Sequence, residues 1–227
     1  MAKGILGDTP QEFTEDRFEE TTRVENTPSI KLRVIASYVI LTLLSAYVIY
    51  DYRIRPDCIC RPRPYVFAIS AFGITGLYGL LGVLNRMNNK PCTAKGFNSL
   101  VYMLEMSIVL PLFASEVWAL EKMFKQYPDM VHLHAATAVP GLANYFFQNE
   151  QKPWMMDASI AYSFSTLTYL GLAHGVIWVA LAAVMYTLAY LYAERSQFMP
   201  RMDFIHDEEI INYCLSAFVL FSKQYLC

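Results

Sequence analysis

The chain has 227 residues, of which 55% are hydrophobic, 15% aromatic and only 17% charged. Soluble domains usually carry about a quarter charged residues, so this composition argues against an ordinary water-facing globule. The high apolar content also excludes a disordered chain. With a net charge of −2, the protein has no concentrated positive surface, and nucleic acid is not an expected partner.

Four long apolar stretches predict membrane-spanning helices. A bilayer core about 30 Å thick requires about 20 apolar residues in a helix that rises about 1.5 Å per residue. The stretches cover residues 34–50, 65–84, 99–120 and 160–192. We therefore expect an all-α, multi-pass transmembrane helical bundle with four strong spans.

Two further segments are expected to be helical, although their patterns leave open whether they cross the membrane. Residues 131–147 contain two histidines and Pro140, which fits a crossing, a re-entrant piece or a surface helix. Residues 208–222 have a short apolar run, and the acidic residues just before it favour a helix N-terminus. The expected number of crossings is therefore four to six.

The last strong stretch is unusually long. An uninterrupted helix over residues 160–192 would measure about 50 Å, which exceeds the hydrocarbon thickness. We expect this helix to tilt, to bend near Gly171 and Gly175, or to project beyond the lipid against another protein. A projecting apolar end would favour a chain that works with partner subunits.

Residues 1–30 form a polar, acidic arm, and residues 31–227 are expected to form a single helical membrane domain. The arm has the pattern of neither a cleavable secretory signal nor an Arg-rich mitochondrial presequence. Lys and Arg are evenly divided between the two sets of predicted loops, so the positive-inside rule gives no orientation. By analogy with small multi-pass subunits, we favour the mitochondrial inner membrane, with the endoplasmic reticulum or another endomembrane as the alternative.

Two carboxyl groups within the third span are the first candidates for a functional site. Glu105 and Glu116 are eleven residues apart, so they project from nearly the same helix face, about 16 Å apart along the axis. Because a charged group within lipid is costly, such residues often mark a polar path. Together with Asn144 and His174 they could line a route for a proton. In a purely structural role, Glu105 would be neutral or hydrogen-bonded, and Glu116 would reach the headgroups.

The histidines and cysteines do not form a recognisable cofactor site. A haem between two helices requires histidines at matched depth, but His174 lies near the middle of its predicted helix while His132 and His134 begin theirs. His132 and His134 also lack a second pair for a transition metal. We therefore expect no haem and no metal. Bound phospholipid is the only accessory molecule that we expect.

The cysteines are scattered along the sequence. Cys58 and Cys60 follow the first span, and Cys92 follows the second, which would place it on the opposite side of the membrane. There is no Cys-x-x-Cys pair for a disulfide relay, and no second pair for zinc.

Small residues recur at helix-packing spacing. They are Gly73, Gly76, Gly79 and Gly82 in the second span, and Gly171 and Gly175 in the last. Such rows let helix backbones approach closely in lipid. The neighbouring helix could belong to this chain or to another one.

The sequence contains no nucleotide-binding, zinc-protease or hydrolase motif, so we do not expect an enzyme. We expect a non-catalytic accessory subunit of a larger, energy-transducing membrane complex of the respiratory-chain or ATP-synthase type. Its partners would be other membrane subunits and lipid, with residues 1–29 docked on a neighbour. The alternatives are a transporter or proton-conducting protein that uses Glu105, Glu116 and His174, and a haem-binding membrane oxidoreductase that uses His174.

Overall fold

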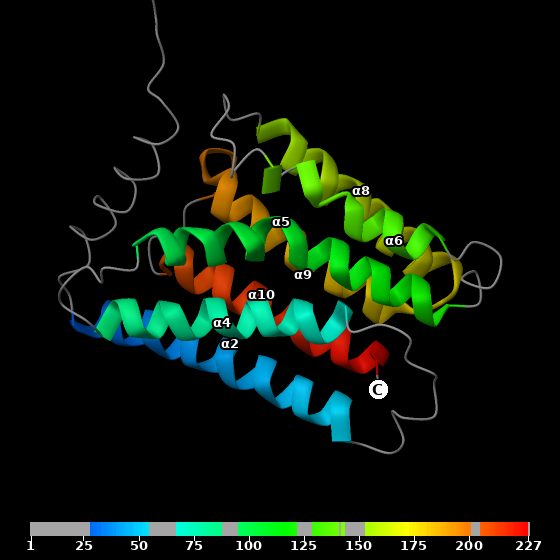
Figure 1. Ribbon diagram of the computed structural model, residues 1–227. Coiled ribbons are helices and arrows are strands. Elements are labelled where there is room, and N and C mark those ends of the chain that lie inside the picture. The colour runs from blue at the N-terminus through cyan, green and yellow to red at the C-terminus, as the bar shows by residue number, and fades with distance from the viewer. Residues whose placement is uncertain are drawn as a thin grey trace, which may run out of the picture.

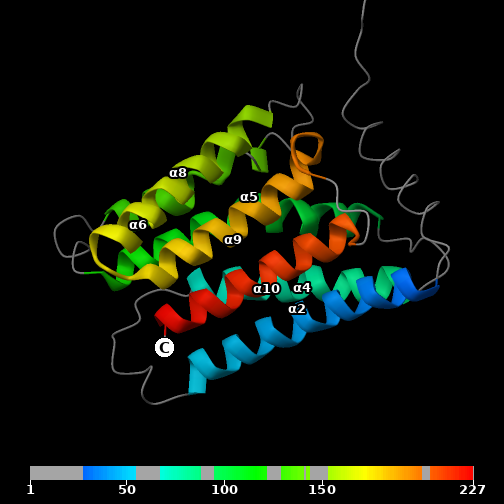
Figure 2. The ribbon, with the colours of Figure 1, turned by 180° about the vertical axis from the view of Figure 1, so that it is seen from behind.

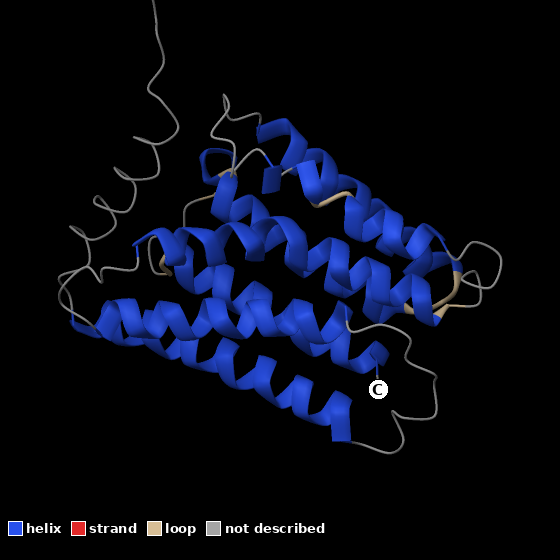
Figure 3. Cartoon of the chain, viewed as in Figure 1, coloured by secondary structure: helices blue, strands red, loops and turns tan. Residues whose placement is uncertain are grey.

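The computed structural model describes residues 28–54, 67–87, 95–121, 129–140, 142–143, 153–200 and 205–226. Within these ranges the regular secondary structure is entirely helical and contains no strand (Figure 3). The arm of residues 1–27 lies outside the described residues, as do Asn144, Cys58, Cys60 and Cys92.

Six long helices and two shorter ones make up the described fold. The long helices are α2 (Pro28–Ile54), α4 (Phe67–Met87), α5 (Lys95–Leu120), α8 (Pro153–Ala173), α9 (Ile177–Glu194) and α10 (Asp207–Leu226). The shorter ones are α6 (Asp129–Ala136) and the single 3-10 turn η2 (Ser196–Phe198). Proline opens α2 and α8, where its missing N–H costs no helical hydrogen bond.

The six long helices form a ring of neighbours. In chain order, α2 packs on α4, α4 on α5, α5 on α8, α8 on α9 and α9 on α10, and α10 returns to α2 (Figures 1 and 2). The short helix α6 packs on α5. Each long helix therefore has at least two neighbours among the described helices, and α5 has a third in α6.

The helices run between two ends of the bundle, which we call the Pro28 end and the Leu226 end. α2, α5, α8 and α10 begin at the Pro28 end, whereas α4 and α9 begin at the opposite end (Figure 1). α5 stops at the Leu226 end and α8 starts at the Pro28 end. α6, which begins near the C-terminus of α5, therefore starts the return of the chain.

Among the described residues, four helices are long and apolar enough to cross a membrane: Ser29–Arg53, Phe67–Met87, Gly96–Leu120 and Ile177–Glu194. The first three overlap the spans predicted at 34–50, 65–84 and 99–120, with ends that differ by a few residues. The predicted multi-pass helical membrane bundle is therefore confirmed.

The prediction of one helix over residues 160–192 is wrong, because the chain reverses direction at Gly175. Its φ of +69° lies in the left-handed region, which is the usual way for glycine to end a helix. α8 and α9 are consequently two antiparallel helices of 21 and 18 residues, about 31 and 27 Å long. Neither helix is longer than a bilayer requires, so the inference of a projecting apolar end no longer holds.

The two weaker segments also differ from their predicted lengths. α6 covers only the first six residues of the segment predicted over 131–147, and the chain turns at Thr137 and Ala138. α10 extends the helix predicted over 208–222 to 20 residues, with three acidic residues in its first turn and Lys223 in its last. Both ends of α10 thus carry charges that complement the helix dipole.

The core lies inside the ring and centres on Phe218 of α10. Its ring contacts Phe72 of α4, Phe113 of α5 and Tyr186 of α9, with centroid separations of 6.3, 5.3 and 5.1 Å. All four side chains are fully buried. This aromatic cluster joins four helices and fills the middle of the bundle.

Candidate functional site

The two glutamates of α5 both point into the bundle. They are the two carboxyl-bearing side chains of α5, and their exposed fractions are 0% for Glu105 and 1% for Glu116. Pro111 lies between them without ending the helix, and the Ser115 hydroxyl donates to its carbonyl oxygen. The two carboxyl groups have different hydrogen-bond partners.

Glu116 is held by donors from two other helices. Its Oε1 accepts a hydrogen bond of 2.8 Å from the Tyr52 hydroxyl of α2, and its Oε2 accepts one of 3.2 Å from the backbone N–H of Ala68. Ala68 lies in the first turn of α4, where backbone N–H groups are free and the helix dipole is positive. Glu116 therefore acts as a cap that ties α5 to α2 and α4.

Glu105 is much less completely partnered. Its Oε1 lies 3.0 Å from the Thr75 hydroxyl of α4, whereas its Oε2 is buried without a hydrogen-bond partner. The Tyr186 hydroxyl donates to the backbone carbonyl of Glu105 rather than to the side chain. This leaves one carboxyl oxygen inside the bundle with its hydrogen-bonding capacity unused.

Among the described residues, the structure does not bring Glu105, Glu116 and His174 together, and Asn144 lies outside the described ranges. Phe113 lies one turn before Glu116 and packs on Phe218, so the aromatic cluster occupies the bundle between the two carboxyl groups. His174 lies in the turn between α8 and α9, with its Nδ1 4.0 Å from Glu121 Oε2. It is therefore at the Leu226 end, away from Glu105.

The glycines predicted to pack in α4 differ in whether they contact a neighbouring helix. Cβ atoms built on Gly76 and Gly79 would lie 3.2 Å from Ser45 Cβ and 3.1 Å from the Tyr38 carbonyl, so both glycines sit against α2. Gly82 likewise lies against the Tyr38 ring, whereas Gly73 has open space around it.

The other predicted pair, Gly171 and Gly175, also has two different roles. Gly171 lies against Ala180 of α9, whose Cβ would be 2.8 Å from an added Cβ. Gly175 is in the turn, with nothing within 4 Å of an added Cβ. Within this chain, Gly171 permits the close approach of α8 to α9, and Gly175 permits the turn.

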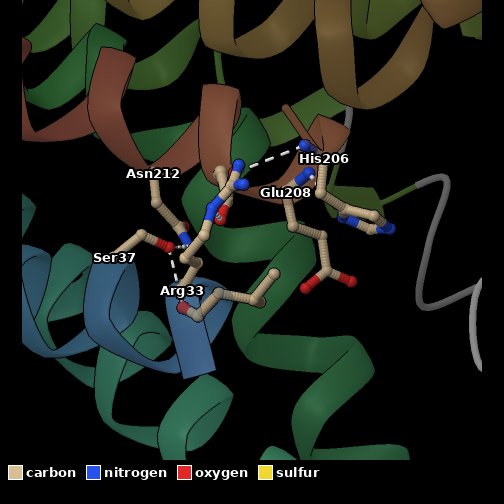
Figure 4. A network of polar contacts seen from close by, with 7 residues as sticks. Arg33, Ser37, His206, Glu208 and Asn212 are labelled. Atoms are coloured by element: carbon tan, nitrogen blue, oxygen red, sulfur yellow. Dashed lines mark hydrogen bonds and ion pairs between the residues drawn. The ribbon is translucent and has the colours of Figure 1, made fainter. Parts of the chain in front are cut away.

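A network of charged residues at the Pro28 end was not foreseen from the sequence. Arg33 of α2 forms two hydrogen bonds with Glu209 of α10, at 3.0 and 2.6 Å (Figure 4). Arg86 of α4 contacts Glu208 at 2.6 Å, and the Tyr38 hydroxyl donates to the same carboxylate at 3.2 Å. The acidic residues that open α10 therefore join three helices.

An uncharged pair, Asn212 and Ser37, continues this network toward the middle of the bundle. The Asn212 side chain donates to the Ser37 hydroxyl at 2.9 Å, and Ser37 in turn donates to the Val34 carbonyl at 2.7 Å (Figure 4). At the Leu226 end, Lys223 binds Asp51 at 2.9 Å and the Tyr47 hydroxyl at 2.7 Å. α10 is thus attached to α2 by ionic contacts at both ends.

His134 of α6 lies between two aromatic rings. The Trp118 ring of α5 and the Tyr162 ring of α8 stack on its two faces, each with centroids 5.2 Å away. Neither ring nitrogen of His134 has a hydrogen-bond partner, and burial lowers the pKa of His134 to about 4. The imidazole is consequently neutral at physiological pH and joins α5, α6 and α8 by stacking.

Within the described ranges, no group of three or more His, Cys, Asp or Glu side chains could hold a metal ion. Cys214 is a free, half-buried thiol on α10. Comparisons of the chain with protein-family models, with curated proteins and with solved structures find no match.

Proposed function

We propose that this protein is a non-catalytic, multi-pass structural subunit of a larger membrane complex, which it contacts through the outer face of α8. The observation that carries the proposal is the difference between the outward faces of α8 and α2. Both helices belong to the ring, and each leaves one side uncovered by the rest of the chain.

The outer face of α2 is suited to lipid. Between residues 36 and 50 its exposed side chains are Ala36, Val39, Ile40, Leu43, Ala46, Tyr47 and Tyr50. The two tyrosines are near the helix end, at the level where aromatic rings with polar tips favour the headgroup region.

The outer face of α8 mixes small residues with hydroxyl groups. Its exposed side chains between residues 158 and 172 are Ala158, Ala161, Tyr162, Ser165, Tyr169 and Leu172. Ala161 and Ser165 form a small-xxx-small pair, which permits close approach of another helix. The Ser165 hydroxyl donates to the Ala161 carbonyl at 2.8 Å, so the hydroxyl groups that would gain from a protein partner rather than lipid tails are those of the exposed tyrosines. The partner proposed here is a transmembrane helix of another subunit.

The test compares matched substitutions on the two faces. Ala161→Leu would obstruct the α8 face, and Ala46→Leu would add the same side chain to the α2 face. In native gels of mildly solubilised membranes, we expect the wild type and A46L to migrate in a large assembly and A161L to migrate alone. A wild-type chain that migrates alone, or an A161L chain that stays in the assembly, would contradict the proposal.

The energy-transducing membrane and the docking of residues 1–29 stay predictions of the sequence. A complex recovered in the same experiment can be identified by its other subunits. Deleting residues 1–27, which lie outside the described structure, should loosen the assembly without unfolding the bundle.

A further inference from the structure

The hydrogen bonds around Thr75 restrict the charge of Glu105. The Thr75 hydroxyl oxygen lies 3.2 Å from the Ala71 carbonyl, one turn earlier on α4, and 3.0 Å from Glu105 Oε1. A hydroxyl group has a single proton to donate, and a carbonyl oxygen can only accept. Both contacts can be full two-centre hydrogen bonds only if Thr75 donates to Ala71 and Glu105 donates to Thr75. A carboxyl group can donate only when it is protonated.

The surroundings of Glu105 offer no compensation for a negative charge. From α9, the Tyr186 hydroxyl donates to the Glu105 backbone carbonyl, and Tyr78 of α4 lies one turn from Thr75. Phenol groups are neutral at physiological pH and supply no positive charge. No basic side chain among the described residues pairs with Glu105, and its Oε2 has no hydrogen-bond donor. An unpaired carboxylate in such a site would cost several kcal/mol, which a bound proton removes.

Two tyrosine side chains lie between this site and the Pro28 end. Tyr78 lies one turn beyond Thr75 on α4, and its ring meets the Tyr38 ring edge to face, with centroids 5.7 Å apart. The Tyr38 hydroxyl donates to Glu208, which also binds Arg86. Glu208 is partly exposed at the end of the bundle. Thr75 and Arg86 are eleven positions apart on α4, so they are separated by about 16 Å along the helix axis.

We propose that Glu105 is a proton-binding site, which exchanges its proton with water at the Pro28 end through Tyr78 and Tyr38. In the exchange, the carboxyl group releases its proton toward Tyr78 and receives another along the same hydroxyl groups, so no net charge moves. On the opposite side of Glu105, the aromatic cluster of Phe113 and Phe218 separates it from Glu116. Glu105 is therefore separated from Glu116 and lies on the side of the cluster that is nearer the Pro28 end. This proposal does not depend on a partner subunit.

Infrared spectroscopy of the full chain in lipid nanodiscs tests the bound proton. At neutral pH the wild type should show the C=O stretching band of a protonated carboxyl group, and Glu105→Gln should lose it. Glu116→Gln is the matched control on the same helix, and it should keep the band. Thr75→Val should keep the band but shift it to higher frequency, because the hydrogen bond to Oγ1 is removed.

A wild-type spectrum without this band would overturn the proposal, and so would a band that persists unchanged in E105Q. The wild-type and T75V measurements decide the matter even where E105Q does not fold. Protonation alone, however, does not test the route by which the proton exchanges.

The route is tested by transfer of the nanodiscs into D₂O while the band shifts to its deuterated position. Tyr78→Phe removes one hydroxyl group of the proposed path, so the shift should be slower than in the wild type. Tyr102→Phe is the control, because the Tyr102 ring also lies near Tyr78 but its hydroxyl donates to Glu194. Equal rates in Y78F and the wild type would overturn the route.

Discussion

Glu105 and Glu116 lie on the same face of the same buried helix, yet their surroundings are opposite. Glu116 accepts hydrogen bonds from a hydroxyl group and from the N-terminus of α4. Glu105 has only the Thr75 hydroxyl as a neighbour, and the single proton of that hydroxyl is engaged by the Ala71 carbonyl. Two carboxyl groups with equal burial therefore have different donors and, by this reasoning, different charges.

The difference shows that burial alone does not define the role of an intramembrane carboxyl group. A carboxylate that caps a helix and binds a hydroxyl group stabilises the contact between helices. A carboxyl group that lacks donors instead holds a proton. Variants that remove one member of the pair, or that change its neighbours, can separate these roles.

The largest effect is expected for Glu116→Ala. This change removes the carboxylate that accepts from the Tyr52 hydroxyl and the Ala68 N–H inside the bundle, and we expect a loss of about 2–4 kcal/mol in the free energy of unfolding. Equilibrium unfolding in mixed detergent micelles measures it. A loss no greater than that of Glu105→Ala would show that the two sites do not differ as described.

A second pair of matched variants tests the packing of α4 on α2. Gly79→Leu places a side chain against the backbone of α2, which should destabilise the bundle by about 1–3 kcal/mol. Gly73→Leu adds the same side chain where an added Cβ meets nothing within 4 Å, so its unfolding free energy should stay close to the wild-type value. Equal effects in the two variants would mean that α2 and α4 do not pack in this register.

The buried, neutral imidazole of His134 should make the stability of the protein depend on pH. Its pKa is about 4 in the folded protein, compared with about 6.5 for an unperturbed histidine, so the unfolded chain binds its proton first as the pH falls. Stability should therefore be full above pH 6.5 and should decrease between about pH 6.5 and 4.

The matched variants for this pH dependence are His134→Phe and His132→Phe. H134F keeps a ring between Trp118 and Tyr162 but cannot be protonated, so it should lose this part of the decrease. H132F changes the exposed histidine of the same helix and should keep it. Parallel curves for the wild type and H134F between pH 6.5 and 4 would contradict a neutral, buried imidazole.

The smallest effect is expected for Glu105→Leu. A neutral carboxyl group with one hydrogen bond contributes little to stability, and leucine restores apolar contacts, so the unfolding free energy should change by about 1 kcal/mol or less. The same micelle titration compares it with E116A. A loss as large as that of E116A would indicate a paired charge at position 105.

The membrane-spanning helices could be predicted from the sequence because length and apolar content determine them locally. α2, α4 and α5 follow directly from uncharged or nearly uncharged runs of suitable length. A bend near Gly171 and Gly175 was one of the expected alternatives, but a full reversal of the chain was not predicted, because the apolar run continues on both sides. The left-handed backbone at Gly175 and the close packing of Gly171 against Ala180 show that there are two helices.

The polar contacts were harder to predict, because their partners are far apart in the sequence. Glu105 and Glu116 were singled out as intramembrane carboxyl groups, but nothing local indicated that Thr75 or Tyr52 would face them. Arg33 and Glu209 are separated by 176 positions, and the acidic residues that open α10 were interpreted only as a helix N-terminus. Pairing these groups requires the ring arrangement of the helices.

The difference between the two glutamates is tested most directly by solid-state NMR of the protein in bilayers, with ¹³C-labelled glutamate carboxyl groups. The variants E105Q and E116Q assign the two signals. At neutral pH, we expect the Glu105 carboxyl carbon to resonate as a protonated acid and that of Glu116 as a carboxylate. Two carboxylate signals, or the reverse assignment, would contradict the account.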